Sequence, residues 1–172
     1  MARPKLKNEY IILGKTAVVD ISTKTHPNSS MKIDLDVWLD LLHRGMGRVS
    51  RDYFYARVYF DGMSRLLHKI ITPSFKDQVD HINHDRFDNR LSNLRSVTQT
   101  ENGRNRSMSK ANKSGHCGIR EYKGVKGSTW LAQIRDGNKQ IHLGTFKTLE
   151  KAIAVRKAAE IELGFHTLHG AK

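Results

Sequence analysis

The sequence has little cysteine, little proline and no long hydrophobic run, and each shortage excludes a class of protein. The single cysteine, Cys117, excludes an internal disulfide and a zinc site built from several thiolates, and it fits a reducing compartment. No apolar stretch reaches the ~18 residues that a membrane-spanning helix needs. Residues 1–7 are basic but no apolar segment follows them, so they do not form a secretory signal. We therefore expect a cytoplasmic protein without a membrane partner, in which Cys117 is a small buried residue.

Acidic residues are scarce as well, because 17 Asp and Glu stand against 30 Lys and Arg. The formal net charge is +13 at pH 7. A surplus of this size favours a polyanionic partner, and nucleic acid is the first candidate. Charge alone does not separate an enzyme that acts on DNA from a structural RNA-binding protein. At 172 residues, the chain has room for one ordinary domain or for two small ones.

One polar run in the middle of the chain carries groups that can do chemistry. The apolar Val79 leads into Asp80 and His81, and a loop rich in Asp and Asn follows at 83–90. Asp80 and, further along, Asn102 offer hard oxygen donors, which suit Mg²⁺ or Mn²⁺ better than zinc. His81 offers an imidazole whose unperturbed pKa lies near neutrality, so it can take a proton from water. A metal ion and a base in a very basic protein indicate phosphodiester hydrolysis.

Over roughly residues 60–105 this run resembles the motif of the His-Asn-His (HNH) nucleases. The residues that carry the resemblance stand in the family's order: Asp80-His81, Asp88-Asn89-Arg90, Asn93-Leu94-Arg95 and Asn102. The resemblance implies a ββα-metal module, in which a β-hairpin and a helix wrap around one metal ion. We expect the core of this module at about 78–103.

The resemblance also implies a role for each matching residue. The first His of the family is the general base, here His81, and the residue before it, here Asp80, binds the metal. The middle Asn, here Asn93, orients the base through hydrogen bonds of the hairpin. The third position is often His and binds the metal, and here it is Asn102. This departure resembles the HNN variants among phage homing endonucleases, and it keeps open an alternative function, a DNA-binding regulator with an inactive nuclease fold.

Two further histidines lie near the motif. His84 is the rival of His81 as the base, but its place in the loop favours contact with solvent or a phosphate. His68 lies in an apolar segment, where a structural His is the commoner case, although the resemblance places this step beneath the metal site. We therefore leave His68 outside the catalytic set.

The charged residues around the loop have simpler roles. Asp85 and Asp88 are typical of turns, which Asx side chains close. Arg90 and Arg95 either pair with Asp residues or reach phosphates, and we count both among the DNA-binding candidates.

Before the motif, the pattern predicts short mixed elements. We expect two strands within 8–22, a helix at 34–43, a strand at 52–60, a turn at 61–62 and a short helix or strand at 65–71. Asp34 is the expected N-cap of the helix. Its apolar face would consist of Leu35, Trp38, Leu39 and Leu42. Packing is the default for Trp38 and for the tyrosines of the 52–60 strand.

Within the motif, we expect a first hairpin strand at 79–82. The residues from Leu91 to Arg95 open either a return strand or turn at 91–97, or a short helix that ends near Asn102.

A basic segment without apolar periodicity follows the motif. Residues 103–113 are predicted to be a linker, and four of them are DNA-binding candidates: Arg104, Arg106, Lys110 and Lys113. The segment is either a solvated tether or a stretch that follows the DNA backbone, and its basic density favours the second.

Residues 114–172 predict a second unit, a three-stranded antiparallel sheet with one helix. Strands are expected at 117–122, 129–135 and 139–146, with a tight turn at 136–138. The helix would run from a Thr148 cap to about Leu163 and end at Gly164. Its small apolar face would consist of Ala152, Val155, Ala159 and Leu163.

Alternation along these strands sorts the side chains between the two faces of the sheet. Trp130, Ala132 and Ile134 would face the helix, with Ile141 and Leu143. The outer face would gather Arg120, Tyr122, Gln133, Arg135, Gln140 and His142. Such side chains can read bases or hold phosphates when a sheet lies in the major groove. The alternative is an ordinary polar surface, but the lack of acidic residues on this face favours DNA.

The second unit resembles the Apetala/ERF-type DNA-binding domain in three runs of sequence. They are Gly118-Ile119-Arg120, Trp130-Leu131-Ala132-Gln133-Ile134-Arg135 and Ile141-His142-Leu143-Gly144-Thr145-Phe146. The resemblance implies that the sheet binds the major groove and that Arg120, Arg135 and His142 contact DNA. Because that family often has an aromatic residue where His142 stands, its base preference does not carry over.

These observations together predict an α+β protein, a two-module DNA endonuclease of the phage homing type. The nuclease domain would occupy 1–102, the linker 103–113 and the DNA-binding domain 114–172. His81 would deprotonate a water in line with a phosphodiester of double-stranded DNA, and one Mg²⁺ or Mn²⁺ at Asp80 and Asn102 would contact the phosphate and the departing 3′ oxygen. We expect a monomer, with a dimer as the alternative.

Overall fold

The computed structural model describes residues 8–171 with gaps at 47, 61 and 125–126. The basic start of the chain and Asp61 of the predicted turn lie outside the described residues. The chain divides into two compact units, Met1–Val97 and Thr98–Lys172. Within the described residues, no helix has the length and apolar character needed to cross a membrane.

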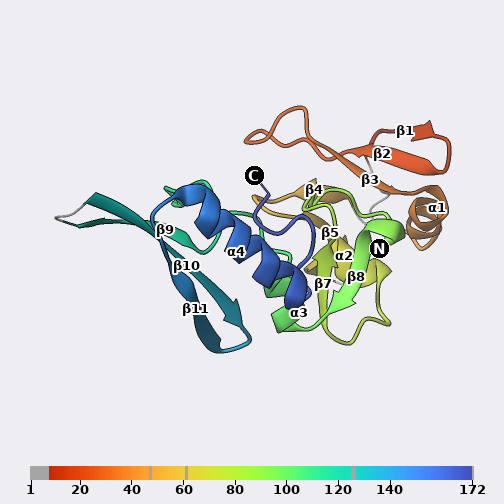
Figure 1. Ribbon diagram of the computed structural model, residues 1–172. Helices are drawn as coiled ribbons and strands as arrows, with labels where there is room; N and C mark the ends of the chain where they lie inside the picture. Colours follow the sequence, from red (N-terminus) through yellow and green to blue (C-terminus); the bar gives the residue numbers. More distant parts are fainter. Residues whose placement is uncertain (1–7, 47, 61, 125–126, 172) are drawn as a thin grey trace. The chain divides into compact units, whose positions relative to one another are not determined.

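The first unit consists of small antiparallel sheets and short helices (Figure 1). Its elements in chain order are β1 (Tyr10–Leu13), β2 (Thr16–Asp20), β3 (Ser30–Asp34), α1 (Leu35–His43), β4 (Val49–Arg51), β5 (Ala56–Phe60), β6 (Met63–Leu66), α2 (Leu67–Ile71), β7 (Gln78–His81), the 3-10 turn η1 (Leu91–Asn93) and β8 (Leu94–Val97). The strands pair in the orders β1-β2-β3, β4-β5-β6 and β7-β8. The predicted strands within 8–22 and the predicted helix at 34–43 are therefore confirmed.

Helix α1 corrects two details of the prediction. Asp34 occupies the N-cap position but makes no capping hydrogen bond with its side chain. Leu39 is 47% exposed, whereas Leu41, outside the predicted face, is 1% exposed. Trp38 is fully buried as expected. The fully buried face of α1 is therefore smaller than the spacing of the leucines predicted. It consists of Trp38 and Leu41, whereas Leu35 and Leu42 are only partly buried against the core.

One hydrophobic core holds the first unit together. Its buried members come from α1, α2, several strands and the loops between them: Ala17, Val19, Ile21, Met31, Ile33, Trp38, Leu41, Met46, Val49, Ala56, Val58 and Leu67. Burial of these side chains supplies the main favourable term for folding. The core therefore fixes β3 and α2, against which the β7-β8 hairpin and its loop are placed.

The predicted strand at 52–60 begins only at Ala56, and residues before it form a turn. Packing as the default was wrong for Tyr53 and Tyr59, which are 76% and 55% exposed. In β5 the inward positions belong to Ala56 and Val58. The segment at 65–71 contains both of the predicted alternatives, because β6 ends at Leu66 and α2 begins with the next residue.

Strands β7 and β8 form the predicted hairpin, with Asp80 opposite Arg95 and His81 opposite Leu94. The alternative of a helix that opens at Leu91 is wrong, since η1 is a single turn and β8 follows it directly.

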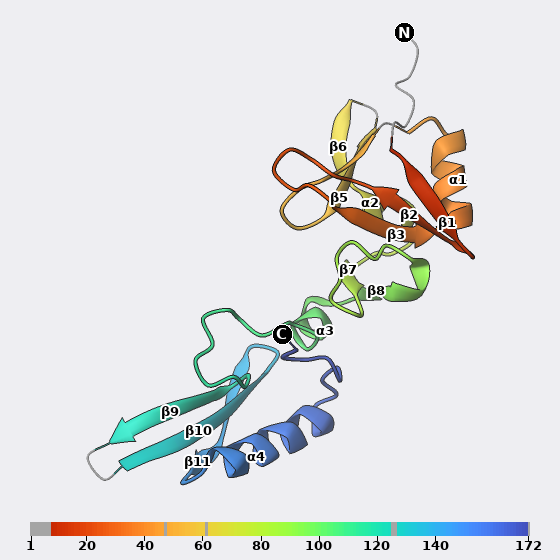
Figure 2. The same ribbon diagram turned by 90° about the horizontal axis from the view of Figure 1, so that it is seen from above.

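The second unit is a sheet with one long helix on it (Figure 2). Its elements are α3 (Gln99–Gly103), β9 (Ile119–Gly124), β10 (Gly127–Asp136), β11 (Lys139–Phe146) and α4 (Leu149–Glu162). The antiparallel order is β11-β10-β9, and α4 packs on one face of the sheet. The hydroxyl of Thr148 accepts a hydrogen bond from Lys151 N, and Gly164 follows the helix with φ +67°, so both predicted helix ends are confirmed.

The helix face of α4 differs from the predicted small apolar face. Ala152 and Ala159 are buried as expected, but the other buried side chains are Arg156 and Glu160, whose Nη1 and Oε1 atoms lie 3.3 Å apart. Nε of Arg156 also donates to Cys117 O at 3.2 Å. The charges are tolerated in the interior because they are paired and hydrogen-bonded. Burial raises the pKa of the Cys117 thiol, which fits an unreactive cysteine.

Part of the predicted linker is hydrogen-bonded to the end of the chain. Arg104 O accepts from His166 N at 3.1 Å, and Arg106 O accepts from Gly170 N at 2.9 Å. Met108 N donates to Ala171 O at 3.1 Å. The compact unit therefore begins at Thr98, before the predicted linker, and 104–108 belongs to its body.

Candidate functional site

The last two residues of β7 lie in the interior of the first unit. Asp80 is 9% exposed and His81 is 4% exposed. Ile82 N, just after them, donates to Asn93 O at 2.9 Å. The carboxylate of Asp80 and the imidazole of His81 thus come from adjacent residues. Pairing of β7 with β8 and the bond from Ile82 N to Asn93 O fix the backbone that carries them.

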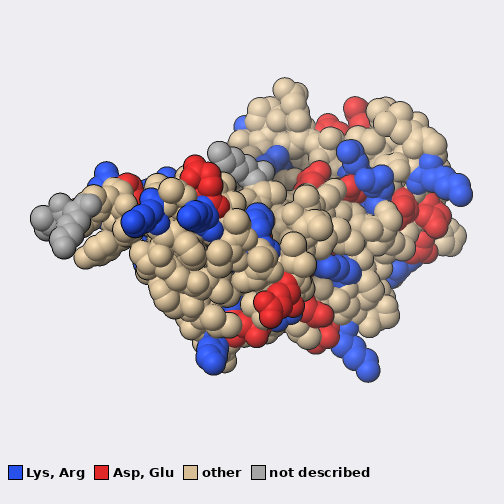
Figure 3. All heavy atoms as spheres, in the orientation of Figure 1, with Lys and Arg blue, Asp and Glu red and all other residues tan. Residues whose placement is uncertain are grey.

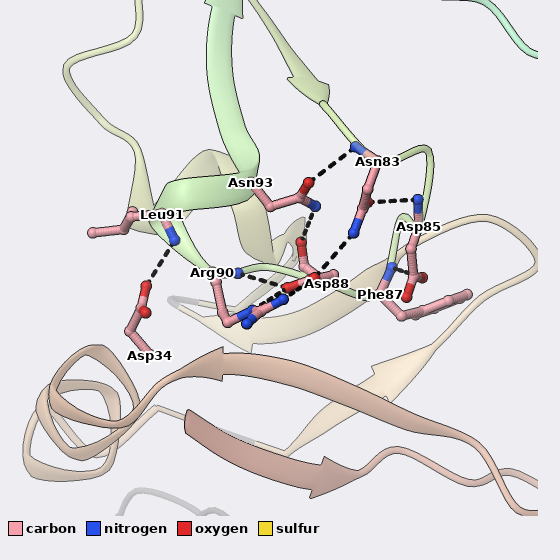
Figure 4. A network of polar contacts seen from close by, with 8 residues as sticks. All are labelled: Asp34, Asn83, Asp85, Phe87, Asp88, Arg90, Leu91 and Asn93. Carbon is pink, nitrogen blue, oxygen red and sulfur yellow. Dashed lines mark hydrogen bonds and ion pairs between the residues drawn. The ribbon is translucent and has the colours of Figure 1, made fainter. Parts of the chain in front are cut away.

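The side chain of Asn93 closes the loop between the strands (Figure 4). Its Oδ1 accepts from Asn83 N at 3.0 Å, and its Nδ2 donates to Asp88 O at 2.8 Å. Both bonds fix the backbone that follows His81. This is the hairpin contact that we expected of the middle Asn, and its effect on the orientation of the base remains a prediction.

Asp88 is the centre of the loop network and is only 1% exposed. It accepts from Asn83 Nδ2 at 3.1 Å and from Arg90 Nε and Nη2 at 2.8 and 2.6 Å. Burial works to raise the pKa of Asp88, but the hydrogen bonds and charge of Arg90 hold it below its ordinary value. The carboxylate therefore stays charged and keeps the loop closed, as we predicted for a turn-forming Asp.

The same loop is attached to β3. Lys32 N donates to Phe87 O at 2.8 Å, and Asn89 N donates to Lys32 O at 2.7 Å. The carboxylate of Asp34 accepts from Leu91 N at 2.7 Å (Figure 4). Asp34 thus serves the loop rather than its own helix, and the core of the first unit sets the position of the hairpin.

Both arginines of the motif pair with aspartates. Arg90 binds Asp88, and Arg95 donates from Nε and Nη2 to Oδ2 of Asp80 at 3.0 and 2.8 Å. Of the two roles left open by the sequence, pairing with Asp is present for each. Contact of Arg90 and Arg95 with DNA remains a prediction.

The rings of His81, His68 and Tyr55 pack against one another. The ring centroid of His68 lies 5.3 Å from that of His81, at an interplanar angle of 88°. Tyr55 lies 5.2 Å from His68 and 6.2 Å from His81. His68 comes from α2 and is buried. We left His68 outside the catalytic set, although the resemblance to the HNH nucleases placed this step beneath the metal site.

Burial sets the protonation of both imidazoles. Burial, the charge of His81 and the charge of Lys69 lower the pKa of His68 to about 4. Burial also lowers the pKa of His81, although the side chain of Asn89 and the charge of Asp80 act in the opposite direction. A neutral His81 at neutral pH is the form that can accept a proton.

His84 has a structural place in the loop. Its φ is +65°, and its N–H donates to His81 O at 3.0 Å. A non-glycine residue in the left-handed region is uncommon, and it marks a turn that the surrounding contacts impose. The choice of His81 over His84 as the base remains a prediction.

The two predicted metal ligands come from different units. Asp80 lies in β7, and Asn102 lies on α3, the first helix after β8. Within the described part of the chain, no cluster of three or more His, Cys, Asp or Glu could hold a metal ion. The carboxylate and amide oxygens fit a hard divalent cation in their donor chemistry. The ligand pair remains a prediction, as does its Mg²⁺ or Mn²⁺.

The six polar residues predicted for the outer face of the second sheet do share a face. Gln133 lies opposite His142, and Arg135 lies opposite Gln140. Oε1 of Gln133 accepts from Arg120 Nη2 at 3.1 Å and also from Gln140. Apart from the half-buried Gln133, the six are exposed. Their contact with DNA remains a prediction.

The basic surplus is not gathered into one patch on the face that Figure 3 shows, where acidic side chains lie between the lysines and arginines. In the second unit, however, a hollow of about 810 Å³ is lined by Arg104, Arg106 and Arg135 among others. Arg104 Nη2 also pairs with Asp136 Oδ1 at 2.7 Å. Lys110 and Lys113 are exposed. Contact of Arg104, Arg106, Lys110 and Lys113 with DNA remains a prediction.

Comparison with known families identifies the hairpin region. Residues 75–104 match the model of a family described as HNH endonuclease. The match contains Asp80, His81, Asn93 and Asn102 and supports a nuclease module, for which DNA is the implied substrate. Comparison with curated proteins and with solved structures gives no match.

Proposed function

We propose that the protein is a site-specific DNA endonuclease of the phage homing type, in which His81 is the general base. The observation that carries the proposal is the environment of His81. Its imidazole is buried at the end of β7, has a lowered pKa and follows a buried carboxylate, all inside the residues that match an HNH endonuclease.

The proposed reaction assigns a role to each residue of the candidate site. Neutral His81 takes a proton from the water that attacks a phosphodiester in line with the departing 3′ oxygen. Asn93 keeps the backbone after His81 in place through its bonds to Asn83 and Asp88. Asp80 and Asn102 would hold a divalent ion, which would supply stabilisation of negative charge on the phosphate. The expected products carry a 5′ phosphate and a 3′ hydroxyl.

Targeting is assigned to the second unit. Its sheet would lie in the major groove of double-stranded DNA in the manner of an Apetala/ERF-type domain, with Arg120, Arg135 and His142 at the bases or phosphates. The shared outer face of these residues and the net charge of +13 support this assignment. The protein would act as a monomer in the cytoplasm of the cell that makes it.

A plasmid-nicking experiment tests the function. The substrate is a supercoiled plasmid that carries the genomic neighbourhood of the gene, incubated with Mg²⁺ or Mn²⁺ and, in parallel, with EDTA. We expect nicking that EDTA abolishes and that His81→Ala reduces by about 10²- to 10⁴-fold while binding of the plasmid DNA survives.

Each opposite result has a definite meaning. Undiminished cutting by His81→Ala removes His81 as the base. A wild-type protein that binds the plasmid but never nicks it, with either ion, is the DNA-binding regulator with an inactive nuclease fold. Binding that shows no preference for duplex DNA over structured RNA would instead indicate a structural RNA-binding protein.

A further inference from the structure

Two large aromatic side chains beside the nuclease hairpin point into solvent. Tyr53 is 76% exposed and Phe54 is 60% exposed. They lie in a turn between β4 and β5, which we call the aromatic loop (residues 52–55). Neither belongs to the core of the first unit, although the ring of Tyr53 packs edge-on against that of His26, with centroids 5.1 Å apart. Neighbouring exposed apolar side chains of this size mark a binding surface.

The aromatic loop is held in one conformation by Asp52. Its Oδ1 accepts from Phe54 N and from Tyr55 N, each at 2.7 Å. Its backbone N–H donates to Tyr55 O at 3.0 Å, and Arg57 Nη1 lies 3.5 Å from its Oδ2. The exposed rings are therefore presented by a closed turn, which reduces the entropy lost when they bind a partner.

The loop adjoins the candidate active site. Its last residue, Tyr55, contributes the ring that lies 6.2 Å from that of His81. The guanidinium of Arg86, from the hairpin loop, lies 5.4 Å from the ring centroid of Phe54 and 5.1 Å from that of Tyr55. Arg86 thus lies against the exposed ring of Phe54 and against the half-buried ring of Tyr55, and Tyr55 in turn lies beside the proposed base.

The chemistry of this surface fits nucleic acid better than a second copy of the chain. Self-association would bring together two chains of formal charge +13, whereas DNA supplies the opposite charge. The faces of the bases are apolar and stack on aromatic side chains in a way that tolerates any sequence. Tyr55, the last residue of the aromatic loop, is the member of this surface whose ring lies beside that of His81.

We propose that Tyr53 and Phe54 stack against DNA bases beside the phosphodiester that is cut and open the base step there. The proposal deepens the endonuclease function and rests on it. Side chains inserted between base steps commonly kink a duplex, and the larger surface that the bent DNA then shares with the protein offsets the lost stacking. The aromatic loop would thus help to present a phosphate to the buried imidazole of His81.

The test measures binding in the full chain, with His81→Ala present in every protein so that no DNA is cut. The probe is a short labelled duplex of mixed sequence, titrated at several salt concentrations. We expect the pair Tyr53→Ala and Phe54→Ala to weaken binding by about 5- to 100-fold. The slope of log affinity against log salt should stay unchanged, because no phosphate contact is lost. A matched control is Leu39→Ala, which removes an exposed apolar side chain from α1 and should change neither quantity.

A second probe reports on the bases themselves. Duplexes with 2-aminopurine at successive positions should brighten at one step when they bind the parent protein, and Phe54→Ala should remove that signal. Phe54→Leu keeps apolar bulk but removes the aromatic ring. If the double variant Tyr53→Ala and Phe54→Ala has a lowered melting temperature, Phe54→Leu replaces it in the binding measurement. We expect Phe54→Leu to bind like Phe54→Ala.

Several results would overturn the inference. Equal affinity of the parent and the double variant excludes stacking, and a reduced salt slope assigns the loop to phosphates. A change in oligomeric state by sedimentation would make the loop an interface between copies. Because binding is measured without cleavage, a wild-type protein that never nicks refutes the endonuclease function and leaves the result on stacking intact.

Discussion

Arg95 donates two hydrogen bonds to a single oxygen of Asp80, from Nε at 3.0 Å and from Nη2 at 2.8 Å. The two residues lie directly opposite each other on β8 and β7. Asp80 is the carboxylate that the proposed site needs, and Arg95 compensates its charge within the protein. The pairing of Arg90 with the buried Asp88 follows the same pattern in the loop.

Replacing Arg95 by Met is therefore expected to lower stability. The change leaves the buried carboxylate of Asp80 without its guanidinium partner, and we expect the free energy of unfolding to fall by about 1–3 kcal/mol. Urea unfolding measures the loss. Arg95→Lys keeps the charge but not both hydrogen bonds to Asp80, so it should lose less. An Arg95 that serves mainly to bind a phosphate would show unchanged stability and a DNA-binding salt slope reduced by about one.

Asn93→Ala is expected to slow cleavage without weakening the binding of DNA. The change removes the bonds to Asn83 N and Asp88 O, so the backbone after His81 is no longer held. A small displacement of a catalytic group typically costs about 10²-fold in rate. Plasmid nicking and duplex binding, measured side by side, separate the two effects. The control is Ser92→Ala, at an exposed neighbour in η1, and equal rates for both variants would contradict the role of Asn93.

The buried His68 should make stability depend on pH. An unfolded His takes up a proton near pH 6.5, whereas His68 in the folded protein does so only at about 4. Between these values the unfolded state binds more protons, so the free energy of unfolding should fall as pH is lowered from 6.5 towards 4 and level off below. The part due to His68 is at most about 3 kcal/mol.

Urea unfolding at a series of pH values, for the wild type and for His68→Gln, tests this assignment. The variant carries no titrating group at this position, so its stability should change less across that range. Parallel curves for the two proteins would show that other groups cause the dependence.

Arg135 on the outer face of the second sheet should contribute to DNA binding in general. We expect Arg135→Ala to weaken duplex binding and to reduce the salt slope by about one if the guanidinium contacts a phosphate. A guanidinium that reads a guanine would instead relax sequence preference at one position. The control is Lys151→Ala, which removes an exposed charge from α4 on the other side of the sheet. Identical losses for the two variants would reduce the effect to net charge.

Much of the second unit could be predicted from short-range pattern. The alternation of Trp130, Ala132 and Ile134, the Thr148 cap and Gly164 each act on neighbours in the chain, so β10, β11 and α4 appear where we expected them. Strand β9 begins at Ile119, later than predicted, because residues 117–118 form a turn. The order of residues in the motif likewise pointed to a hairpin strand at 79–82 that contains Asp80 and His81, and β7 lies one residue earlier, at Gln78–His81, within the residues that the family match covers.

The errors lie where distant residues meet. Asp34 is bonded to Leu91 instead of capping α1, because the loop after β7 docks on β3. Arg156 and Glu160 occupy a face that composition marked as apolar, since a paired charge can be buried.

By itself, the sequence determined most of the local elements and the large positive charge, and it named the candidate reactive groups, because these depend on neighbouring residues or on composition alone. Only the tertiary structure decided that His68 packs against His81, that Arg95 covers Asp80 and that Tyr53 and Phe54 remain outside the core. Each of these outcomes depends on which segments the core of the first unit brings together. Contacts of that kind leave no periodic trace in the chain.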